Sequence, residues 1–550
     1  MASISDKPQP AVTLSPREQL EAWTQSDDGG KRLRRVPPDE LYAYIREVGL
    51  ADATEAVRLA SAEQFRSLVD LDVWRRDRPD TGRLLGWLRA ARGSGGPRYL
   101  AKLRKLDVEL FELLLKERLL IHDLTQEPEP ATGRREPFQT FDGYFLVELP
   151  DDPVEANALR QLVTDLYAED AQYAQRVLTA VRWELSSDLE EHAYRWRSAR
   201  LADLGFPPLE EASTLYARAE PSAPLPPASL PEAPRSLPVL AETAPDLLRR
   251  ALALLPPADS GRVQAGLVVL ANQALVADGV DPGDPARARE ILDRVQATLA
   301  LGLAELSHGD AAQAARLLVE AALKRIFQIG FTATLKIQWA AERALWAAPL
   351  RFPRANVACL DAPDRAVFAA VRRRRPLYPG VLEAPGAPDR PFRTPLDVAA
   401  ARVAIEQAQR KARLLVAAGV DPAEAEPRFS PYSSLYPLGE LGPSDLFLCA
   451  LAREAAGAGW RVAPLTPHEL SSAIAAIFPE GGPTPRESIA ERARERLERA
   501  RASVEDAQPE LAREFWDRCA RRLEDEVGRF VAAHAPLPPV SPFKVVPEER

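Results

Sequence analysis

Four polar side chains within a short stretch have the chemistry to bind an anion. His192, Tyr194, Arg197 and Arg200 lie in the segment EEHAYRWRSARLADLGFP, residues 190–207. Arginine guanidinium groups bind carboxylates and phosphates through paired N–H donors, and histidine exchanges a proton near neutral pH. We therefore take these four residues as candidate ligand-binding residues. They would belong to an enzyme or small-ligand sensor with an anion-binding pocket around His192, Arg197 and Arg200.

The helix that must position these side chains also allows a structural interpretation. At helical spacing the segment has two faces with apolar members, so the helix is predicted to pack on two sides. One face holds Leu185, Leu189, His192, Trp196 and Ala199, and the other holds Tyr194, Arg197, Leu201 and Leu204. Neighbouring carboxylates and carbonyls would then satisfy the arginines, and Gly205 would end the helix in a left-handed cap. Because no nucleophile or second titratable partner can be assigned nearby, the structural interpretation is favoured over a pocket.

The composition disfavours several classes of protein. The chain has 550 residues and is 46% hydrophobic, so it is long enough for more than one core, because single cores stop growing near roughly 250–300 residues. A net charge of −9 disfavours binding to nucleic acid or anionic lipid. No long apolar run occurs and the opening MASISDKPQPAVTL lacks signal-peptide features, so we expect no membrane insertion and a cytoplasmic location. The preference for arginine over lysine is typical of a GC-rich bacterium.

Residues suited to metal or cofactor chemistry do not form a usable pattern. Cys359, Cys449 and Cys519 lie far apart, so they indicate neither a zinc site nor a disulfide framework. No phosphate-binding glycine loop is complete. We therefore expect no cofactor and no metal, and an enzyme is not the favoured class.

Helix-start signals are the clearest local feature. A serine or threonine followed by proline, with an acidic residue three positions on, occurs at Ser15, Thr394, Thr466 and Thr484. The hydroxyl accepts a hydrogen bond from a free backbone N–H, the proline occupies the first helical position, and the carboxylate faces the positive helix end. Ser61 begins a capping box without the proline. Each of these residues is predicted to start a helix.

Apolar residues at helical spacing follow these signals and predict an all-α fold. The segment PFQTFDGYFLVELP is the one convincing strand signal, and it predicts a small β-hairpin at about 138–149 with a type I′ turn at Asp142-Gly143. The expected architecture is a multi-lobed helical-repeat or helical-bundle protein with this hairpin.

Proline-rich stretches divide the chain into predicted parts. Seven prolines between Pro221 and Pro238 cannot sustain a helix and predict a semi-rigid linker. The predicted order is a mobile N-terminal tail with a short helix from Ser15 (1–30), an N-terminal helical lobe with the hairpin (31–216), the proline-rich linker (217–239), a central helical lobe (240–350), a partly irregular connector (351–392), a C-terminal helical lobe (393–535) and a tail (536–550).

Weak internal repetition precedes the hairpin. The segments VPPDELYAYIREVGL, ASAEQFRSLVDLDVW and KLDVELFELLLKERLL each place a cap or proline, an acidic residue and two apolar turns. This pattern resembles the N-terminal helical repeats of bacterial magnesium transporters and of the flagellar motor-switch protein. A regulatory module of that kind implies a melting temperature that depends on magnesium.

Longer blocks resemble those of an uncharacterised bacterial family known as a domain of unknown function. They are DLDVWRRDR (70–78), EEHAYRWRSARLADLGFP (190–207), ALVADGVDPGDP (274–285), LKRIFQIGFTATLKIQ (323–338) and GPSDLFLCAL (442–451). The resemblance implies a largely helical, cytoplasmic bacterial protein and brings no reaction, ligand or catalytic residue with it.

The favoured function is that of a non-enzymatic cytoplasmic protein-interaction or scaffold protein built from helix pairs. This expectation rests on the stacked helix pairs, the long linker and the lack of a recognisable catalytic set. It implies a protein partner and no nucleic acid. The alternative is the enzyme or small-ligand sensor described above.

Overall fold

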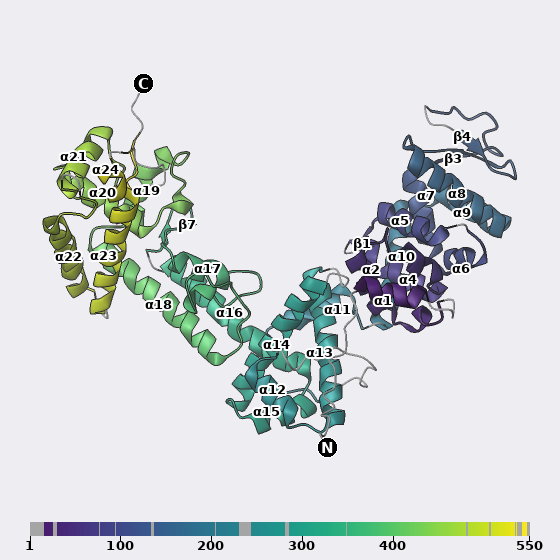
Figure 1. Ribbon diagram of the computed structural model, residues 1–550, viewed down its shortest axis with the longest axis horizontal. Coiled ribbons are helices and arrows are strands. Elements are labelled where there is room, and N and C mark those ends of the chain that lie inside the picture. Colours follow the sequence, from purple (N-terminus) through teal and green to yellow (C-terminus); the bar gives the residue numbers. More distant parts are fainter. Residues whose placement is uncertain are drawn as a thin grey trace, which may run out of the picture. The chain divides into compact units, whose positions relative to one another are not determined.

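The computed structural model describes most of the chain, and helices dominate the described part (Figure 1). The described residues are 16–25, 30–75, 78–93, 95–133, 137–203, 205–229, 244–280, 285–347, 349–479, 482–504, 508–533, 535 and 542–546. The all-α fold class is confirmed, because the strands between these helices are short. The predicted N-terminal tail up to Ser15, linker residues 230–239 and most of the predicted C-terminal tail lie outside the described residues.

The chain divides into two compact units. Unit 1 contains Met1–Ala217 and Gly261–Val295, and unit 2 contains Arg218–Ser229 and Gln296–Arg550 together with a stretch before residue 261. The lobe boundaries drawn from proline content remain predictions.

Unit 1 is built from paired helices with a small sheet at one end (Figure 1). α2 packs on α4, α3 on α5, and α7 on both α9 and α10. Ser61 caps α4 in the predicted capping box, in which its hydroxyl accepts from the Gln64 N–H and the Gln64 side chain accepts from the Ser61 N–H. The helices are α1 (Pro16–Thr24), α2 (Pro38–Val48), α3 (Thr54–Leu59), α4 (Ala62–Asp72), α5 (Thr81–Arg92), α6 (Pro97–Lys105), α7 (Val108–Arg118), α8 (Pro153–Glu169), α9 (Ala171–Trp183), α10 (Ser186–Asp203) and α11 (Leu209–Ser213).

The sheet of unit 1 contains the predicted hairpin and one further strand. β4 (Pro137–Gln139) pairs antiparallel with β5 (Phe145–Glu148), which confirms the hairpin. β3 (Leu120–Asp123) pairs with the other edge of β5, giving the order β3-β5-β4. The sequence pattern did not predict β3, because its four residues follow α7 with only Leu119 between them.

The predicted type I′ turn of the hairpin is wrong. That turn needs a positive φ at both central residues, whereas Gly143 has φ 77° and Asp142 does not have a positive φ. The Asp142 carboxylate instead accepts hydrogen bonds from the Thr140 hydroxyl and, across the loop, from Tyr167 in α8 and Gln175 in α9. These tertiary contacts select a longer loop than the local dipeptide predicts.

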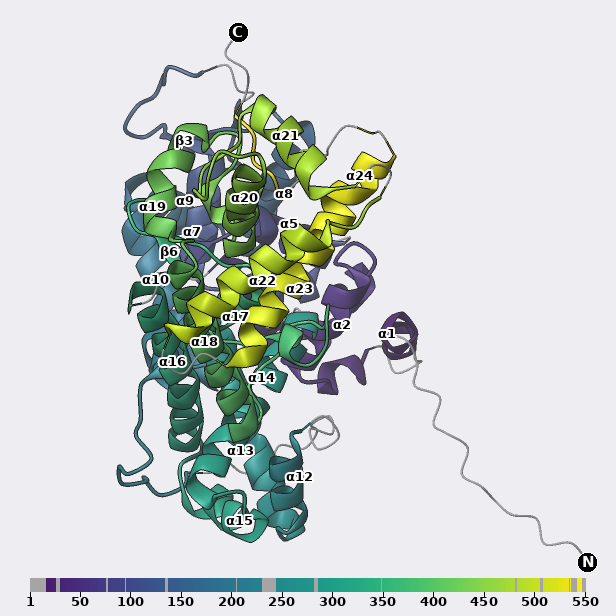
Figure 2. The same cartoon turned by 90° about the vertical axis from the view of Figure 1, so that its left-hand side faces the viewer.

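Unit 2 is also built from packed helices, among them α16 with α18 and α22 with α23 (Figure 2). α13 (Pro257–Asp278) and α14 (Pro285–Ser307) contribute residues to both units. The other helices are α12 (Asp246–Ala253), α15 (Ala311–Glu320), α16 (Leu323–Ala347), α17 (Asp364–Val371), α18 (Pro395–Ala417), α19 (Pro422–Phe429), α20 (Pro443–Ala455), α21 (Pro467–Ile477), α22 (Glu487–Ala502), α23 (Pro509–Leu523) and α24 (Arg529–Ala532), and the short strands β6 (Arg351–Phe352) and β7 (Val357–Ala358) pair with each other.

Two glycines allow α14 and α16 to approach closely in unit 2. A Cβ atom built on Gly302 would lie 2.0 Å from the Ile326 carbonyl oxygen. A Cβ atom built on Gly330 would lie 2.0 Å from the Thr298 carbonyl oxygen. Any larger residue at either position would therefore force the two helices apart.

Most of the predicted helix starts are confirmed. Thr394 and Thr466 cap α18 and α21 in complete capping boxes, and α1 begins at Pro16, although Ser15 itself lies outside the described residues. The start at Thr484 is wrong, because α22 begins at Glu487. The Arg486 N–H donates to the Ile477 carbonyl at the end of α21, so the backbone here turns back to that helix before α22 starts.

Part of the predicted linker is held by unit 2. Pro227 forms a bridge with Ala321, and the Ala228 N–H donates to the Glu320 carbonyl. The Ala219 N–H donates to the Thr332 hydroxyl of α16. The stretch up to residue 229 is thus tied to unit 2 at single residues, while most of residues 220–229 are exposed.

Candidate functional site

Arg200 on α10 joins two carboxylates from different helices. Its Nε and Nη2 atoms donate to the two oxygens of Asp70 in α4, at 2.7 and 2.8 Å. Its Nη1 and Nη2 atoms donate to the two oxygens of Asp107, which precedes α7, at 2.9 and 2.6 Å. Burial disfavours the charged guanidinium, but the hydrogen bonds that Arg200 donates to both aspartates outweigh burial and raise its pKa. The arginine is therefore a fixed cation in a built network.

Arg197 is held one helical turn before Arg200. Its Nε donates to the backbone carbonyl of Asp70 at 2.8 Å, and its guanidinium carbon lies 5.0 Å from the centre of the Trp74 ring. The Trp74 ring also lies 6.2 Å from the ring of Tyr194. Burial lowers the pKa of Arg197 to about 10, so the side chain still carries its charge at neutral pH. Tyr194 and Arg197 thus meet at Trp74.

His192 does not join the other predicted ligand-binding residues. The structure leaves its side chain exposed, while Arg197 and Arg200 are directed toward α4. An anion pocket would need free donors, and four N–H groups of Arg200 already bind carboxylates. The geometry favours the structural interpretation of the arginines, as anchors of α10.

The prediction that α10 packs on two sides is wrong for one of its faces. Leu189 is buried at 3% exposure, but Leu185 and Trp196 are exposed at 64% and 58%. Trp183, at the end of α9, is exposed at 64%. Helical spacing identifies a face, but it does not tell which face receives a partner. We call Trp183, Leu185, His192 and Trp196 the outer patch of α10.

Asp72 is a second buried carboxylate that sequence reasoning missed. It accepts hydrogen bonds from the Tyr42 hydroxyl at 2.8 Å and from the Trp87 Nε1 at 2.7 Å, and Arg46 and Arg83 lie within 3.3 Å of it. Its only sequence signal is an aspartate two residues after Asp70 in a helix end that is otherwise apolar. Asp70 joins the block 70–78 to α10, and Asp72 joins it to α2 and α5.

Unit 2 contains a comparable network around Asp361. Both the backbone N–H and the hydroxyl of Ser444, in the first turn of α20, donate to its carboxylate. Arg522 of α23 donates to the Ser444 hydroxyl at 2.6 Å and to Asp445 at 3.0 Å. A Cβ atom on Gly442 would lie 1.9 Å from an Asp361 oxygen, so the glycine of GPSD is required for this close approach. These contacts of the block 442–451 therefore fix the start of α20.

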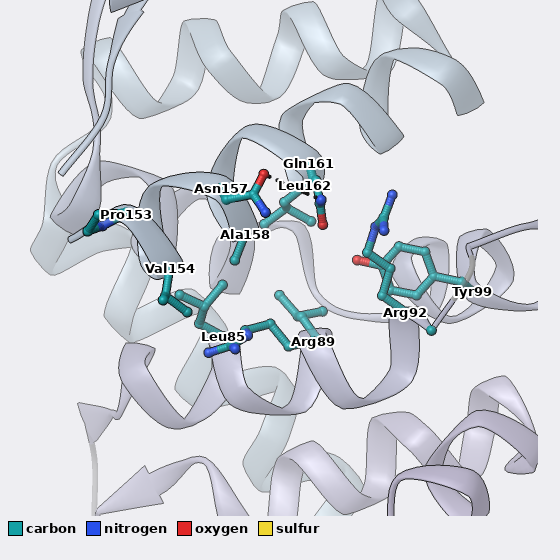
Figure 3. A pocket seen from close by; sticks show the side chains of 12 residues that line it. Leu85, Arg89, Arg92, Tyr99, Pro153, Val154, Asn157, Ala158, Gln161 and Leu162 are labelled. Atoms are coloured by element: carbon teal, nitrogen blue, oxygen red, sulfur yellow. Dashed lines mark hydrogen bonds between the residues drawn. The ribbon is translucent and has the colours of Figure 1, made fainter. Parts of the chain in front are cut away.

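A groove of about 400 Å³ in unit 1 lies between α5 and α8 (Figure 3). Arg92 at one end is paired with Asp165 through two hydrogen bonds at 2.7 and 3.2 Å. Burial raises the pKa of Tyr99, so its hydroxyl stays protonated. The lining combines apolar side chains with amides and arginines, but no acid–base pair: Leu85, Leu88, Arg89, Arg92, Gly93, Tyr99, Pro153, Val154, Asn157, Ala158, Gln161 and Leu162.

Groups that could support metal or thiol chemistry are not brought together in the described part of the chain. No cluster of three or more histidine, cysteine, aspartate or glutamate side chains there could hold a metal ion. Cys359, Cys449 and Cys519 are buried, and burial raises the pKa of Cys449 to about 12. None of these thiols is poised as a nucleophile. Among the described helices, none is long and apolar enough to cross a bilayer.

The fold and these networks define a helical protein in which an arginine–carboxylate network joins the blocks 70–78 and 190–207. The chain belongs to the family of unknown function DUF6178, whose model matches residues 3–542. The resemblance to a domain of unknown function is thereby confirmed. No curated protein and no solved structure matches the chain.

Proposed function

We propose that this chain is a non-enzymatic, cytoplasmic protein-interaction or scaffold protein, and that the outer patch of α10 is a contact surface for its partner. The observation that carries the proposal is the exposure of three large apolar side chains, Trp183 and Leu185 at the junction of α9 and α10 and Trp196 further along α10. Tryptophan is the residue type most enriched in the energetic centres of protein interfaces. Large apolar side chains gathered on a surface mark interaction sites.

The anchoring of α10 supports this role. Arg197 and Arg200 hold the C-terminal half of α10 on α4 and on the residue before α7, so the helix that carries Trp196 is fixed in place. A rigid surface loses little conformational entropy when it binds, which favours affinity. In this proposal, Arg197 and Arg200 do not bind a ligand. They position the helix that carries the outer patch.

The charge around the outer patch indicates the chemistry of the partner. Arg195 lies on α10 between His192 and Trp196, and it pairs with Glu191 one turn earlier on the exposed surface. Such an exposed pair costs little to break. We expect the partner to offer an apolar pocket for Trp196 with a polar rim, the usual anatomy of a protein interface.

Affinity capture from the source cells tests the proposal. A tagged full chain should retain a partner in stoichiometric amounts, and Trp196→Glu should reduce the recovered amount at least tenfold, because a charge would enter an apolar contact. Leu396→Glu is the matched control, since Leu396 is equally apolar and exposed at 79% but lies on α18 in unit 2. Recovery of the chain alone, or equal recovery with Trp196→Glu, would contradict the proposal.

A further inference from the structure

The segment Pro542–Val546 lies in unit 2 and pairs with the residue before α21 through one isolated bridge. Val545 forms a parallel bridge with Leu465, which precedes α21. The Leu465 N–H donates to the Lys544 carbonyl and the Val546 N–H donates to the Leu465 carbonyl, both at 2.7 Å. This pattern of pairing is the one by which proteins add a peptide strand to an exposed edge.

Two side chains of unit 2 recognise the backbone of the segment. The Tyr436 hydroxyl donates to the Val545 carbonyl at 3.0 Å and accepts from the Val545 N–H at 3.1 Å. The Cys449 thiol donates to the Pro542 carbonyl and accepts from the Lys544 N–H, both at 3.5 Å. Backbone groups of Pro542, Lys544, Val545 and Val546 are thus bound by residues of α20 and of the loops before and after it.

Two side chains of the segment enter specific surroundings. Phe543 is buried at 3% exposure in the apolar core of unit 2. The Lys544 ammonium lies 3.6 Å from an Asp445 oxygen and 5.7 Å from the centre of the Tyr436 ring. An apolar slot followed by an anion and an aromatic face would recognise an aromatic residue followed by a lysine.

Residues that contact the segment are also held by other parts of unit 2. Asp445 accepts a hydrogen bond from the Gly442 N–H at 2.9 Å and another from Arg522 at 3.0 Å. Leu465 lies next to Thr466, whose capping box fixes the start of α21. The groups that bind the segment are therefore held in place by contacts that do not involve it.

We propose that the residues that contact this segment, Tyr436, Asp445, Cys449 and Leu465, form a peptide-recognition site, and that Pro542–Val546 is an exchangeable ligand that occupies it within the same chain. The site takes an extended peptide with the order phenylalanine, lysine and two β-branched residues. A partner segment with this order would compete with residues 542–546 of the same chain. This site is separate from the outer patch of α10 and does not depend on it.

A cleavable full chain tests the proposal. A protease site is inserted between Ala535 and Pro542, and binding of a fluorescent peptide SPFKVVPEER is measured by anisotropy before and after cleavage. The cut chain should bind the peptide at least about tenfold more tightly than the uncut chain, because a tethered segment competes at a high effective concentration. Tyr436→Phe in the cut chain should weaken binding about fivefold, since two hydrogen bonds to the peptide backbone are lost.

Tyr432→Phe is the matched control, because the Tyr432 hydroxyl has no hydrogen-bond partner within the described residues, and this variant should bind like the cut parent. Equal binding by cut and uncut chains would overturn the proposal. So would a loss of folded structure, measured by circular dichroism, when the cut segment is diluted away, because the segment would then be a core strand instead of a ligand. A Tyr436→Phe variant that binds like the Tyr432→Phe control would also overturn it.

Discussion

Arg200 binds both carboxylate oxygens of Asp70, a residue that lies 130 positions earlier in the chain. The pair joins the block 190–207 to the block 70–78, and Arg200 adds Asp107 to the same network. Arg197 reaches the backbone of Asp70 from the next turn. Arg197 and Arg200, two of the four side chains predicted to bind a ligand, thus fix α10 on α4.

Removal of the Arg200 side chain should destabilise unit 1. We expect Arg200→Ala to lower the free energy of unfolding by about 3 kcal/mol, because two carboxylates, one of them fully buried, lose their counterion. Arg195→Ala on the same helix should leave stability unchanged, because its pair with Glu191 is exposed. Urea titration followed by tryptophan fluorescence checks both variants. Equal effects of the two substitutions would show that the Arg200 network does not hold α10.

Most helix starts could be predicted from the sequence. The contacts that each helix makes with other elements could not. Capping boxes at Ser61, Thr394 and Thr466 are local, so residues three positions apart specify them. The Thr484 start failed because a tertiary contact of Arg486 with the end of α21 displaces it. Long-range contacts of this kind leave no trace in local spacing.

The contacts of the candidate site could not be predicted from local spacing either. The pattern singled out Arg197 and Arg200 as candidate ligand-binding residues, but their partner Asp70 lies in a different block and could not be matched to them. Asp72 was missed because a single aspartate at the end of a helix has many ordinary explanations. The exposure of Trp196 could not be predicted either, since an amphipathic face looks the same whether the partner lies within the chain or outside it.

Glycine-to-alanine substitutions should have opposite effects at two helical positions. Gly330→Ala should destabilise unit 2 by about 2–3 kcal/mol, because its Cβ would lie 2.0 Å from the Thr298 carbonyl oxygen. Gly86→Ala in α5 should stabilise by about 0.5–1 kcal/mol, because its Cβ meets only Leu50 at 3.9 Å and alanine favours helix. Thermal unfolding of both variants provides the measurement. A stable Gly330→Ala variant would contradict the close crossing of α14 and α16.

Stability should depend on pH through Glu112 in α7. Burial, with smaller contributions from Glu109 and Glu184, raises the pKa of Glu112 from 4.5 to about 7. Between these values the folded chain keeps a proton that the unfolded chain has lost, so stability falls as pH rises through this window and is constant above it. Glu112→Gln should therefore raise the free energy of unfolding by about 1–3 kcal/mol at pH 8 and change it little at pH 4.5.

Urea titrations of Glu112→Gln and of the parent chain across this pH range check the prediction. Glu210→Gln is the control, because Glu210 is exposed on α11 and should leave the pH profile unchanged. A profile for Glu112→Gln that parallels the parent would show that Glu112 is charged at neutral pH in the folded chain.

Photocrosslinking at position 196 tests the interaction role most directly. A photoreactive phenylalanine analogue is placed at Trp196 on the outer patch of α10, and at Leu396 in a control chain, and both are irradiated in the source cells. We expect a single discrete adduct with another protein from position 196 and none from position 396, and Leu185→Glu should abolish that adduct. Absence of any protein adduct from position 196, with the chain folded and expressed, would contradict the account.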